Sequence, residues 1–137
     1  GGPAKSNNGS EALYVSAHIM VDYGSEERQE KRENLYSKVL RLPDLVSYQD
    51  GTVASRMLIN KKAGSVTIFS FDEGEGLSEH TAPYDAVVTI LDGECEVWVE
   101  GKTFQVRTGD TIILPANKPH ALSAVTKFKM TLTMIRE

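Results

Sequence analysis

The sequence contains one cysteine, no excess of positive charge and no long apolar run, and each absence argues against a class of protein. Cys95 is the only cysteine among 137 residues, so no disulfide forms within the chain and a reducing compartment is expected. The formal net charge is −4 and no basic cluster offsets it, which argues against a nucleic-acid or anionic membrane surface. No apolar stretch matches a membrane span or a secretory signal. We therefore predict a cytoplasmic protein without nucleic-acid or membrane partners.

The N-terminal part, residues 1–46, is predicted to be an extension. Residues 1–10 are rich in Gly, Ser and Asn, which is typical of a flexible tail or of vector-encoded residues. If these residues are vector-encoded, Met20 is expected to be the natural start of the chain. Apolar and more polar residues alternate over 13–23, however, and this pattern favours a strand that adds to a sheet edge of this chain or of a neighbouring subunit. Both interpretations stay open at this stage.

A charged segment follows and predicts a short solvated helix over about residues 25–33. Ser25 is a suitable N-cap, and Glu26 and Glu27 place negative charge in the first turn, where the helix dipole favours it. Farther on, Pro43 is expected to end any regular element, because proline restricts the backbone of the residue before it.

Residues 47–137 consist of short β-rich runs separated by turn signals, and we assign them to one domain. Asp92-Gly93 lies between two apolar runs and predicts a tight hairpin, because glycine tolerates a positive φ angle. No helical pattern interrupts the series, so the sequence predicts an all-β sandwich or closed barrel. The predicted strands cover residues 53–59, 66–71, 86–91, 95–99, 104–106, 111–114 and 127–135.

Two segments in this region carry glycine, histidine and proline at a distinctive spacing. The first places His80 between Gly74 and Gly93, and the second runs from Gly109 through Pro115 to His120. This arrangement resembles the paired motifs of the cupin superfamily and extends over about the last ninety residues. The resemblance implies a jelly-roll β-barrel with a pocket centred on the two histidines.

The departures from the cupin pattern bear on metal binding. Metal-binding cupins hold a transition metal with three histidines and one glutamate, and His80 and His120 match two of these positions. Ala82 and Ala86 stand at the other histidine and the glutamate, Ala124 replaces a final asparagine, and Asn117 replaces a glycine. The resemblance therefore implies an incomplete site, with at most a weakly bound divalent metal such as Zn, Fe, Mn or Ni.

The residues near the first histidine predict the wall of a pocket. Strand alternation places His80, Ala82, Tyr84 and Ala86 on one side, although Pro83 disturbs the pattern. Alanine in place of larger polar ligands leaves room for a small organic molecule. Tyr84 is either a proton donor beside the imidazoles or a packing residue with a wet hydroxyl. The predicted pocket consists of His80, Ala82, Tyr84, Ala86, His120 and Leu122.

Two classes of function follow from this pocket. One is a module that binds a small organic ligand without catalysis, which the alanines at ligand positions favour. The other is an enzyme, either a metal-dependent oxygenase or isomerase or a metal-free acid–base catalyst, with His80, His120 and Tyr84 as catalytic residues.

A homodimer is also expected. Cys95 alternates with inward valines and is predicted to be buried, while Trp98 should lie on the outer face of its strand, where tryptophan often marks a subunit contact. The possible strand over residues 13–23 offers a second means of pairing subunits.

Overall fold

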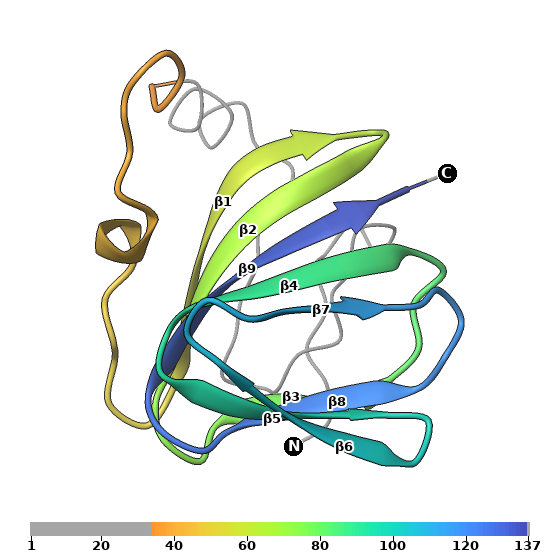
Figure 1. Ribbon diagram of the computed structural model, residues 1–137. Helices are drawn as coiled ribbons and strands as arrows, with labels where there is room; N and C mark the ends of the chain where they lie inside the picture. Colours follow the sequence, from red (N-terminus) through yellow and green to blue (C-terminus); the bar gives the residue numbers. More distant parts are fainter. Residues whose placement is uncertain (1–33, 137) are drawn as a thin grey trace.

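The computed structural model describes residues 34–136, and within them two antiparallel β-sheets pack face to face (Figure 1). A short 3-10 helix, η1 (Leu42–Leu45), precedes the sheets. The strands are β1 (Val53–Lys61), β2 (Gly64–Phe71), β3 (Gly76–His80), β4 (Asp85–Asp92), β5 (Glu94–Val99), β6 (Lys102–Arg107), β7 (Thr111–Leu114), β8 (His120–Ala124) and β9 (Phe128–Ile135).

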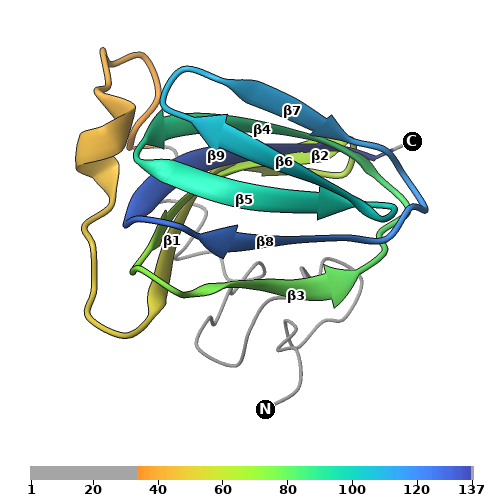
Figure 2. The same cartoon turned by 60° about the horizontal axis from the view of Figure 1, so that its bottom comes forward.

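The order of the strands in space is that of a jelly roll. The larger sheet has the order β1-β2-β9-β4-β7 and the smaller sheet the order β3-β8-β5-β6. From β3 onwards the chain changes sheet at every connection except the one between β5 and β6, so most neighbours in each sheet are distant in sequence. Figure 2 shows the two layers facing each other. The predicted all-β jelly-roll barrel is confirmed. No helix among residues 34–136 has the length and apolar character needed to cross a membrane.

Aromatic packing closes one end of the barrel. Phe71 on β2 lies directly opposite Phe128 on β9, and their rings stack with centroids 4.4 Å apart. Phe69 packs beside Phe71, and all three side chains are fully buried. Farther along β9 the inward positions hold methionine and leucine. This change from rings to flexible chains leaves space at the opposite end of the barrel.

The predicted hairpin at Asp92-Gly93 is wrong, although the seven predicted strands are present. β4 belongs to the larger sheet and β5 to the smaller one, so Gly93 forms a corner between the sheets. Its φ angle is +82°, and a Cβ atom there would lie 2.1 Å from the main-chain oxygen of Lys127. A corner and a hairpin both need the positive φ that glycine supplies, and the local sequence does not distinguish them.

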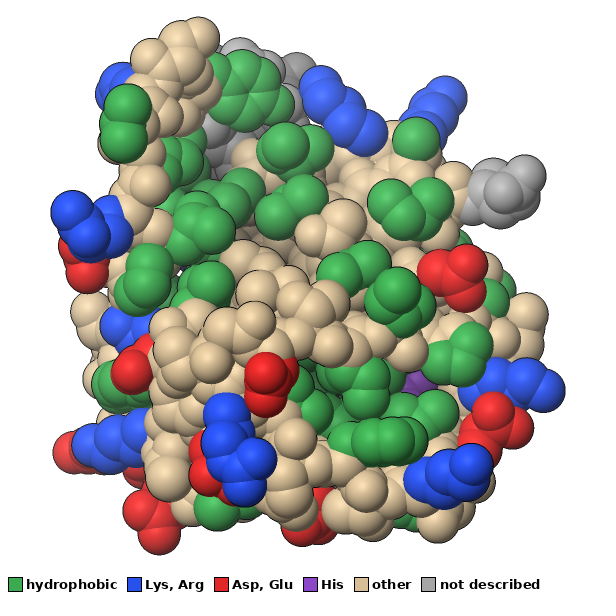
Figure 3. Space-filling model, in the orientation of Figure 1, with side chains coloured by type: hydrophobic (Ala, Val, Ile, Leu, Met, Phe, Trp, Pro, Cys, Tyr) green, Lys and Arg blue, Asp and Glu red, His purple; other side chains and the backbone are tan. Residues whose placement is uncertain are grey.

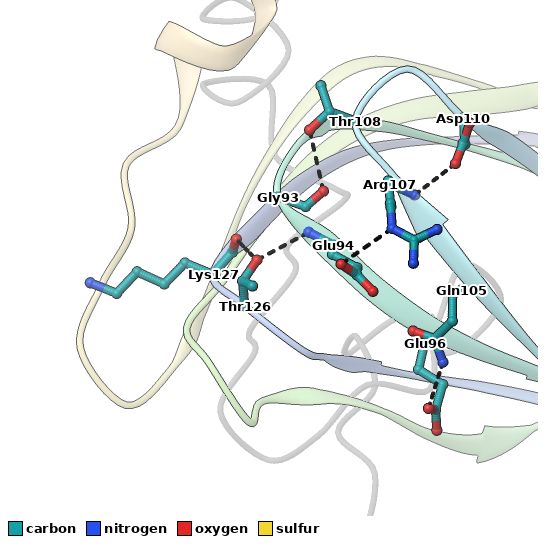
Figure 4. A network of polar contacts seen from close by, with 9 residues as sticks. All are labelled: Gly93, Glu94, Glu96, Gln105, Arg107, Thr108, Asp110, Thr126 and Lys127. Carbon is teal, nitrogen blue, oxygen red and sulfur yellow. Dashed lines mark hydrogen bonds and ion pairs between the residues drawn. The ribbon is translucent and has the colours of Figure 1, made fainter.

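Polar contacts hold this corner in place, as Figure 4 shows. The amide of Glu94 donates to Thr126 Oγ1 at 3.1 Å, and Thr108 Oγ1 donates to the carbonyl of Gly93 at 3.2 Å. Arg107 forms an ion pair with Glu94 at 3.4 Å. The corner is thereby tied to the turns that follow β6 and β8.

The chain before β1 packs against the larger sheet from residue 42 onwards. Pro43 lies in the first turn of η1, so the prediction that it ends an element is wrong; proline is favoured at a helix start, where its missing N–H costs nothing. The amine of Lys129 donates to the carbonyl of Pro43 at 2.6 Å, and Ser70 Oγ donates to that of Ser47 at 2.8 Å. The predicted tail, the strand over 13–23 and the helix over 25–33 lie outside the described residues.

Candidate functional site

Two histidine side chains meet where β3 ends and β8 begins. His80 is the last residue of β3, His120 is the first of β8, and the two are direct partners across the smaller sheet. Their rings lie edge to face with centroids 4.4 Å apart. The Nε2 atoms are 3.1 Å apart. His120 is buried and His80 is half-buried, so the pair lies between the barrel interior and its mouth.

The other ring nitrogens are held by main-chain carbonyl groups. His80 Nδ1 lies 2.7 Å from the oxygen of Ser78, and His120 Nδ1 lies 3.0 Å from that of Lys118. A carbonyl oxygen only accepts a hydrogen bond, so each Nδ1 carries a proton and donates. Each ring contacts the carbonyl two residues before it in sequence, and this fixes its orientation.

The three contacts of this pair need one proton more than two neutral imidazoles possess. A neutral imidazole carries a single N–H, and both protons are used on the carbonyl groups of Ser78 and Lys118. The two Nε2 atoms therefore face each other as acceptors across 3.1 Å. A lone pair of this kind is able to bind a proton, a metal ion or a donor group of a ligand.

Burial keeps the pair uncharged near neutral pH. Desolvation lowers the pKa of His80 below its ordinary value, and the Nδ1 contact with Ser78 opposes this shift. The pKa of His120 is also lowered, first by desolvation and then by the charge of His80. Both imidazoles are therefore neutral at pH 7, with their protons on the Nδ1 atoms.

A cavity of about 30 Å³ adjoins the histidines and is otherwise almost wholly apolar. This volume is close to the share of one water molecule in the liquid, whereas pockets for organic ligands usually measure about 300–1,000 Å³. All six residues of the predicted pocket border the cavity, including the alanines at the two missing ligand positions. The lining consists of Leu77, His80, Ala82, Tyr84, Ala86, Val88, Leu114, His120, Ala121, Leu122, Met130, Leu132 and Met134.

Residues 80–86 do not form one continuous strand, although His80, Ala82, Tyr84 and Ala86 all border the cavity. β3 ends at His80 and β4 starts at Asp85 in the other sheet, so the chain crosses between the layers at Ala82. The amide of Asn117 donates to the carbonyl of Ala82 at 2.7 Å, which joins the two motifs at the barrel mouth. Asn117 has a φ angle of +64°, the left-handed conformation expected where it replaces glycine.

The cavity wall contributed by β9 was not anticipated from the sequence. Met130, Leu132 and Met134 face inward, and they neighbour Val88 and Ala86 on β4. Their alternation with polar residues gave a strand signal over 127–135. The strand pairing that brings them opposite the histidines is not visible in the local sequence.

Tyr84 borders the cavity from the segment that joins the two sheets. Its ring packs against the core, and the Arg136 guanidinium lies 5.7 Å from the ring centroid, within the range of a cation–π contact. The side chain is held on one side by the core and on the other by a cation.

The described residues supply only two conventional metal ligands at this site. Within residues 34–136 no group of three or more histidine, cysteine, aspartate or glutamate side chains is arranged to hold a metal ion. A metal at His80 and His120 would therefore depend on water or an organic ligand to complete its shell.

A second hollow lies between β6 and β7, the edge strands of the two sheets. Phe104 is 41% exposed and Ile113 is 64% exposed beside it. Figure 3 shows hydrophobic side chains spread over the face of the molecule that is seen in Figure 1.

Cys95 is buried and Trp98 is half-buried on the opposite side of β5, as the alternation predicted.

Comparison with known proteins settles the family. The sequence pattern of the cupin domain matches residues 67–136 of the chain. The chain belongs to the cupin family. A conserved protein of unknown function from Streptococcus pyogenes is 38% identical to this cupin, with 74% of this chain and 90% of that chain aligned and a TM-score of 0.72. No match was found among curated proteins.

Two further solved structures share the fold of this cupin. A cupin 2 conserved barrel domain protein from Leptotrichia buccalis is 44% identical, with a TM-score of 0.69, over 71% of this chain and 47% of that chain. The alignment thus spans about half of the Leptotrichia protein. A cupin superfamily protein from Desulfitobacterium hafniense is 27% identical over 74% of this chain and 93% of that chain, with a TM-score of 0.71.

Proposed function

We propose that this cupin binds a small organic molecule inside its barrel and that His80 and His120 anchor the polar end of that molecule. The observation that carries the proposal is the position of the two histidine side chains, which line a cavity whose other residues are apolar apart from Tyr84. An O–H or N–H group of a ligand would donate a hydrogen bond to Nε2 of His120.

The rest of the cavity favours an uncharged ligand with an apolar body. Apart from the histidines and Tyr84, every lining residue is apolar, and no Lys, Arg, Asp or Glu is among them. A charged group would lose its hydration there without gaining a counter-charge. Because the cavity measures only about 30 Å³, binding requires Met130 or Met134 to change rotamer. Methionine does this readily, since its side chain is long and unbranched.

Binding is the part of the function that the geometry supports best, and catalysis is not required by it. The two Nε2 atoms are acceptors at neutral pH, so acid–base chemistry at this site would begin with proton abstraction from a ligand. Tyr84 borders the same cavity, and its phenol would be the proton donor in such a reaction.

The binding proposal is tested with the full chain labelled at its methionine methyl groups. The probes are a panel of small neutral alcohols and amides, including 1-pentanol. We expect at least one probe to shift the methyl signals of Met130 and Met134 and to leave Met57, which lies outside the cavity, unchanged. His120→Ala should abolish this binding. Probes that bind equally well to His120→Ala, or a panel that shifts neither methyl signal, would refute the proposal.

A divalent metal ion is the second candidate occupant. Metal–nitrogen distances of about 2.0–2.1 Å with nitrogens 3.1 Å apart correspond to an angle of about 95–102° at the metal, between octahedral and tetrahedral values. The Nδ1–H contacts with carbonyl groups are the outer contacts that orient metal-binding histidines. A bound metal would act as a Lewis acid on a ligand oxygen, as in an oxygenase or isomerase.

Elemental analysis of protein purified without a metal-affinity step separates the two candidates. We expect occupancy well below one metal per chain, because two imidazoles are about half of the usual ligand set. His80→Ala or His120→Ala should remove what is bound. Full occupancy that survives a chelator would overturn the binding proposal in favour of a metalloenzyme.

A further inference from the structure

The outer face of the larger sheet carries a row of uncharged side chains that crosses all five strands. Residues directly opposite each other in an antiparallel pair project from the same face. The register places Ile59 of β1 opposite Val66 of β2, and Val66 opposite Thr133 of β9. Thr133 is opposite Val87 of β4, and Val87 is opposite Ile113 of β7. The row points away from the barrel, because the core takes the alternate residues of β9 and β4.

Much of this face is exposed to solvent although it is largely apolar. Ile59 is 40% exposed and Ile113 is 64% exposed, one at each edge of the sheet. Ile135, two residues after Thr133 on β9, is 55% exposed. Figure 3 shows hydrophobic side chains gathered over β2, β9 and β4, with charged side chains mainly around them. Contiguous apolar patches are uncommon on the surface of monomeric proteins and often mark an interaction site.

The outer face of the smaller sheet differs, because charged side chains cover it. Glu94 of β5 forms an ion pair with Arg107 of β6, and Gln105 donates to Glu96 (Figure 4). On the outer face of the larger sheet, the charged residues that the structure describes lie at or next to the strand ends, apart from Arg56 on the edge strand β1. The centre of a protein interface is depleted of charge, so the larger sheet has the face suited to a protein partner.

The row reads the same in both directions, as isoleucine, valine, threonine, valine and isoleucine. A two-fold axis that runs along β9, between two facing copies, would bring β1 onto β7 of the partner and β2 onto β4 of the partner. Ile59 would then meet Ile113 of the partner subunit, and Val66 would meet Val87 of the partner subunit. Thr133 would meet Thr133 of the partner subunit. A two-fold dimer needs a surface that is complementary to itself, and this row fulfils that condition.

The charges at the rim of the face also fit a second copy. Lys61 at the end of β1 and Asp85 at the start of β4 share one register across the sheet, with Gly64 and Ile135 between them. The same two-fold axis would bring Lys61 close to Asp85 of the partner subunit, and the reverse pair would form on the other side. Opposite charges at a polar rim favour the correct orientation of the two copies.

The size of the face is sufficient for a reversible dimer. The chain before β1 covers one end of it, where Ser70 and Lys129 hold that chain and Ile68 is fully buried. The free part extends over five strands about 4.8 Å apart and about three rows of side chains about 6.7 Å apart, which gives about 500 Å². Two copies would bury about 1,000 Å² together, which is near the smallest area expected of a biological interface. Dissociation should therefore be measurable at micromolar concentrations.

We propose that the outer face of the larger sheet is the interface of a symmetric homodimer, with the two-fold axis at Thr133. The two larger sheets pack face to face about 10 Å apart, with their strands within about 30° of each other. This contact removes the exposed side chains of Ile59, Ile113 and Ile135 from water. It does not depend on whether the barrel binds a ligand.

The test is analytical ultracentrifugation of the full chain from low to hundreds of micromolar, with Thr133→Lys and Thr133→Glu as variants. Each variant alone places like charges opposite each other at the axis, whereas an equimolar mixture of the two places opposite charges there. We expect the parent to dimerise and the dissociation constant of each variant to rise at least about tenfold, which corresponds to about 1.4 kcal/mol. The mixture should recover the dimer, because only at the two-fold axis does a residue meet its own copy.

Three further variants control for folding and for the choice of surface. Ile113→Lys changes an exposed position on an edge strand, so it should fold even where the Thr133 variants do not, and it should weaken the dimer as well. Ser123→Lys adds the same charge to the outer face of the smaller sheet, opposite Glu96, and should leave the dissociation constant unchanged. Proteins also pair through edge strands, so Phe104→Lys on β6 tests that arrangement and should leave the dimer intact.

The contrary results are distinct. A parent chain that sediments as a monomer at hundreds of micromolar overturns the inference. A dimer that both Thr133→Lys and Ile113→Lys leave intact also overturns it, and dissociation of that dimer by Phe104→Lys would place the contact at the edge of β6 and β7. If both folded Thr133 variants lose the dimer and their mixture does not recover it, the axis is not at Thr133 and the proposed arrangement is wrong.

Discussion

Restoring the two missing ligands should convert this site into a strong metal site. The variant Ala82→His with Ala86→Glu returns a histidine and a glutamate to positions that border the same cavity as His80 and His120. The variant then places four ligands around one point, and four is the usual number of ligands in a stable transition-metal site. The parent offers only the Nε2 pair, whose 3.1 Å separation already fits two adjacent ligands of one metal.

The expected magnitude follows from mass action and from the size of the domain. At a hundredfold excess of metal over the dissociation constant, binding stabilises the folded state by about 2.7 kcal/mol. A domain of about 100 ordered residues has an unfolding entropy of roughly 0.2 kcal/mol per kelvin, so the melting temperature should rise by about 13 °C. Without metal the variant should be less stable than the parent by about 1–3 kcal/mol, because the added side chains exceed the space available.

The assay is a thermal unfolding series with Zn²⁺ or Mn²⁺, supported by calorimetric titration. The matched control is Thr81→His with Val87→Glu, which installs the same groups one position away, where neither residue borders the cavity. This control should gain no metal-dependent stability. A folded Ala82→His, Ala86→Glu variant that binds metal no more tightly than the parent would refute the reasoning, because the four positions would then not face one point.

Four further measurements follow from the structure. Folding lowers the pKa of both histidines, so below about pH 6.5 the unfolded chain binds more protons than the folded chain. The free energy of unfolding should therefore decline as the pH falls, by up to about 1.4 kcal/mol per pH unit for each histidine. In chemical denaturation at several pH values, His120→Ala should show a shallower decline than the parent, and an equal slope would contradict this. Gly93→Ala should destabilise the fold by more than about 2 kcal/mol, because its Cβ would lie 2.1 Å from a main-chain oxygen. Gly101→Ala is the control, since its φ angle is similar and no atom lies within 4 Å of its Cβ, and it should destabilise the fold by about 1 kcal/mol. Burial and a nearby carboxylate raise the pKa of Cys95 to about 12, so thiol reagents at pH 8 should label it only after unfolding, and rapid labelling of the native protein would contradict its burial. Light scattering at tens of micromolar should give twice the chain mass, because the sheets present edge strands that proteins commonly cover by pairing, and a monomer would count against the expected dimer.

The paired motifs predicted the fold because glycine, proline and histidine recur in them at short spacing, and the resemblance to cupins implied a pocket centred on the two histidines. Gly74, Gly93 and Gly109 all have positive φ angles, as turn positions require, and Asn117 has the left-handed backbone of the glycine that it replaces. These are local properties, and a sequence records them directly. The barrel then brings the motifs together through the pairing of β3 with β8.

Long-range pairing and the direction of side-chain atoms were beyond the reach of the sequence. Asp92-Gly93 carries the same signal for a hairpin and for a corner, and only the pairing of β4 with β9 decides between them. The protonation of the histidine pair depends on which carbonyl groups contact the Nδ1 atoms, and no residue type specifies that.

The protonation state of the two imidazole rings tests the central claim most directly. Long-range nitrogen–proton correlation spectra at pH 7.5 report whether each ring nitrogen of His80 and His120 carries a proton, and single alanine variants assign the signals. The account predicts a proton on both Nδ1 atoms and none on either Nε2 atom, with both Nε2 signals moving when Zn²⁺ or a donor ligand is added. A protonated Nε2 on either ring at this pH, or Nε2 signals that no added donor or metal moves, would contradict it.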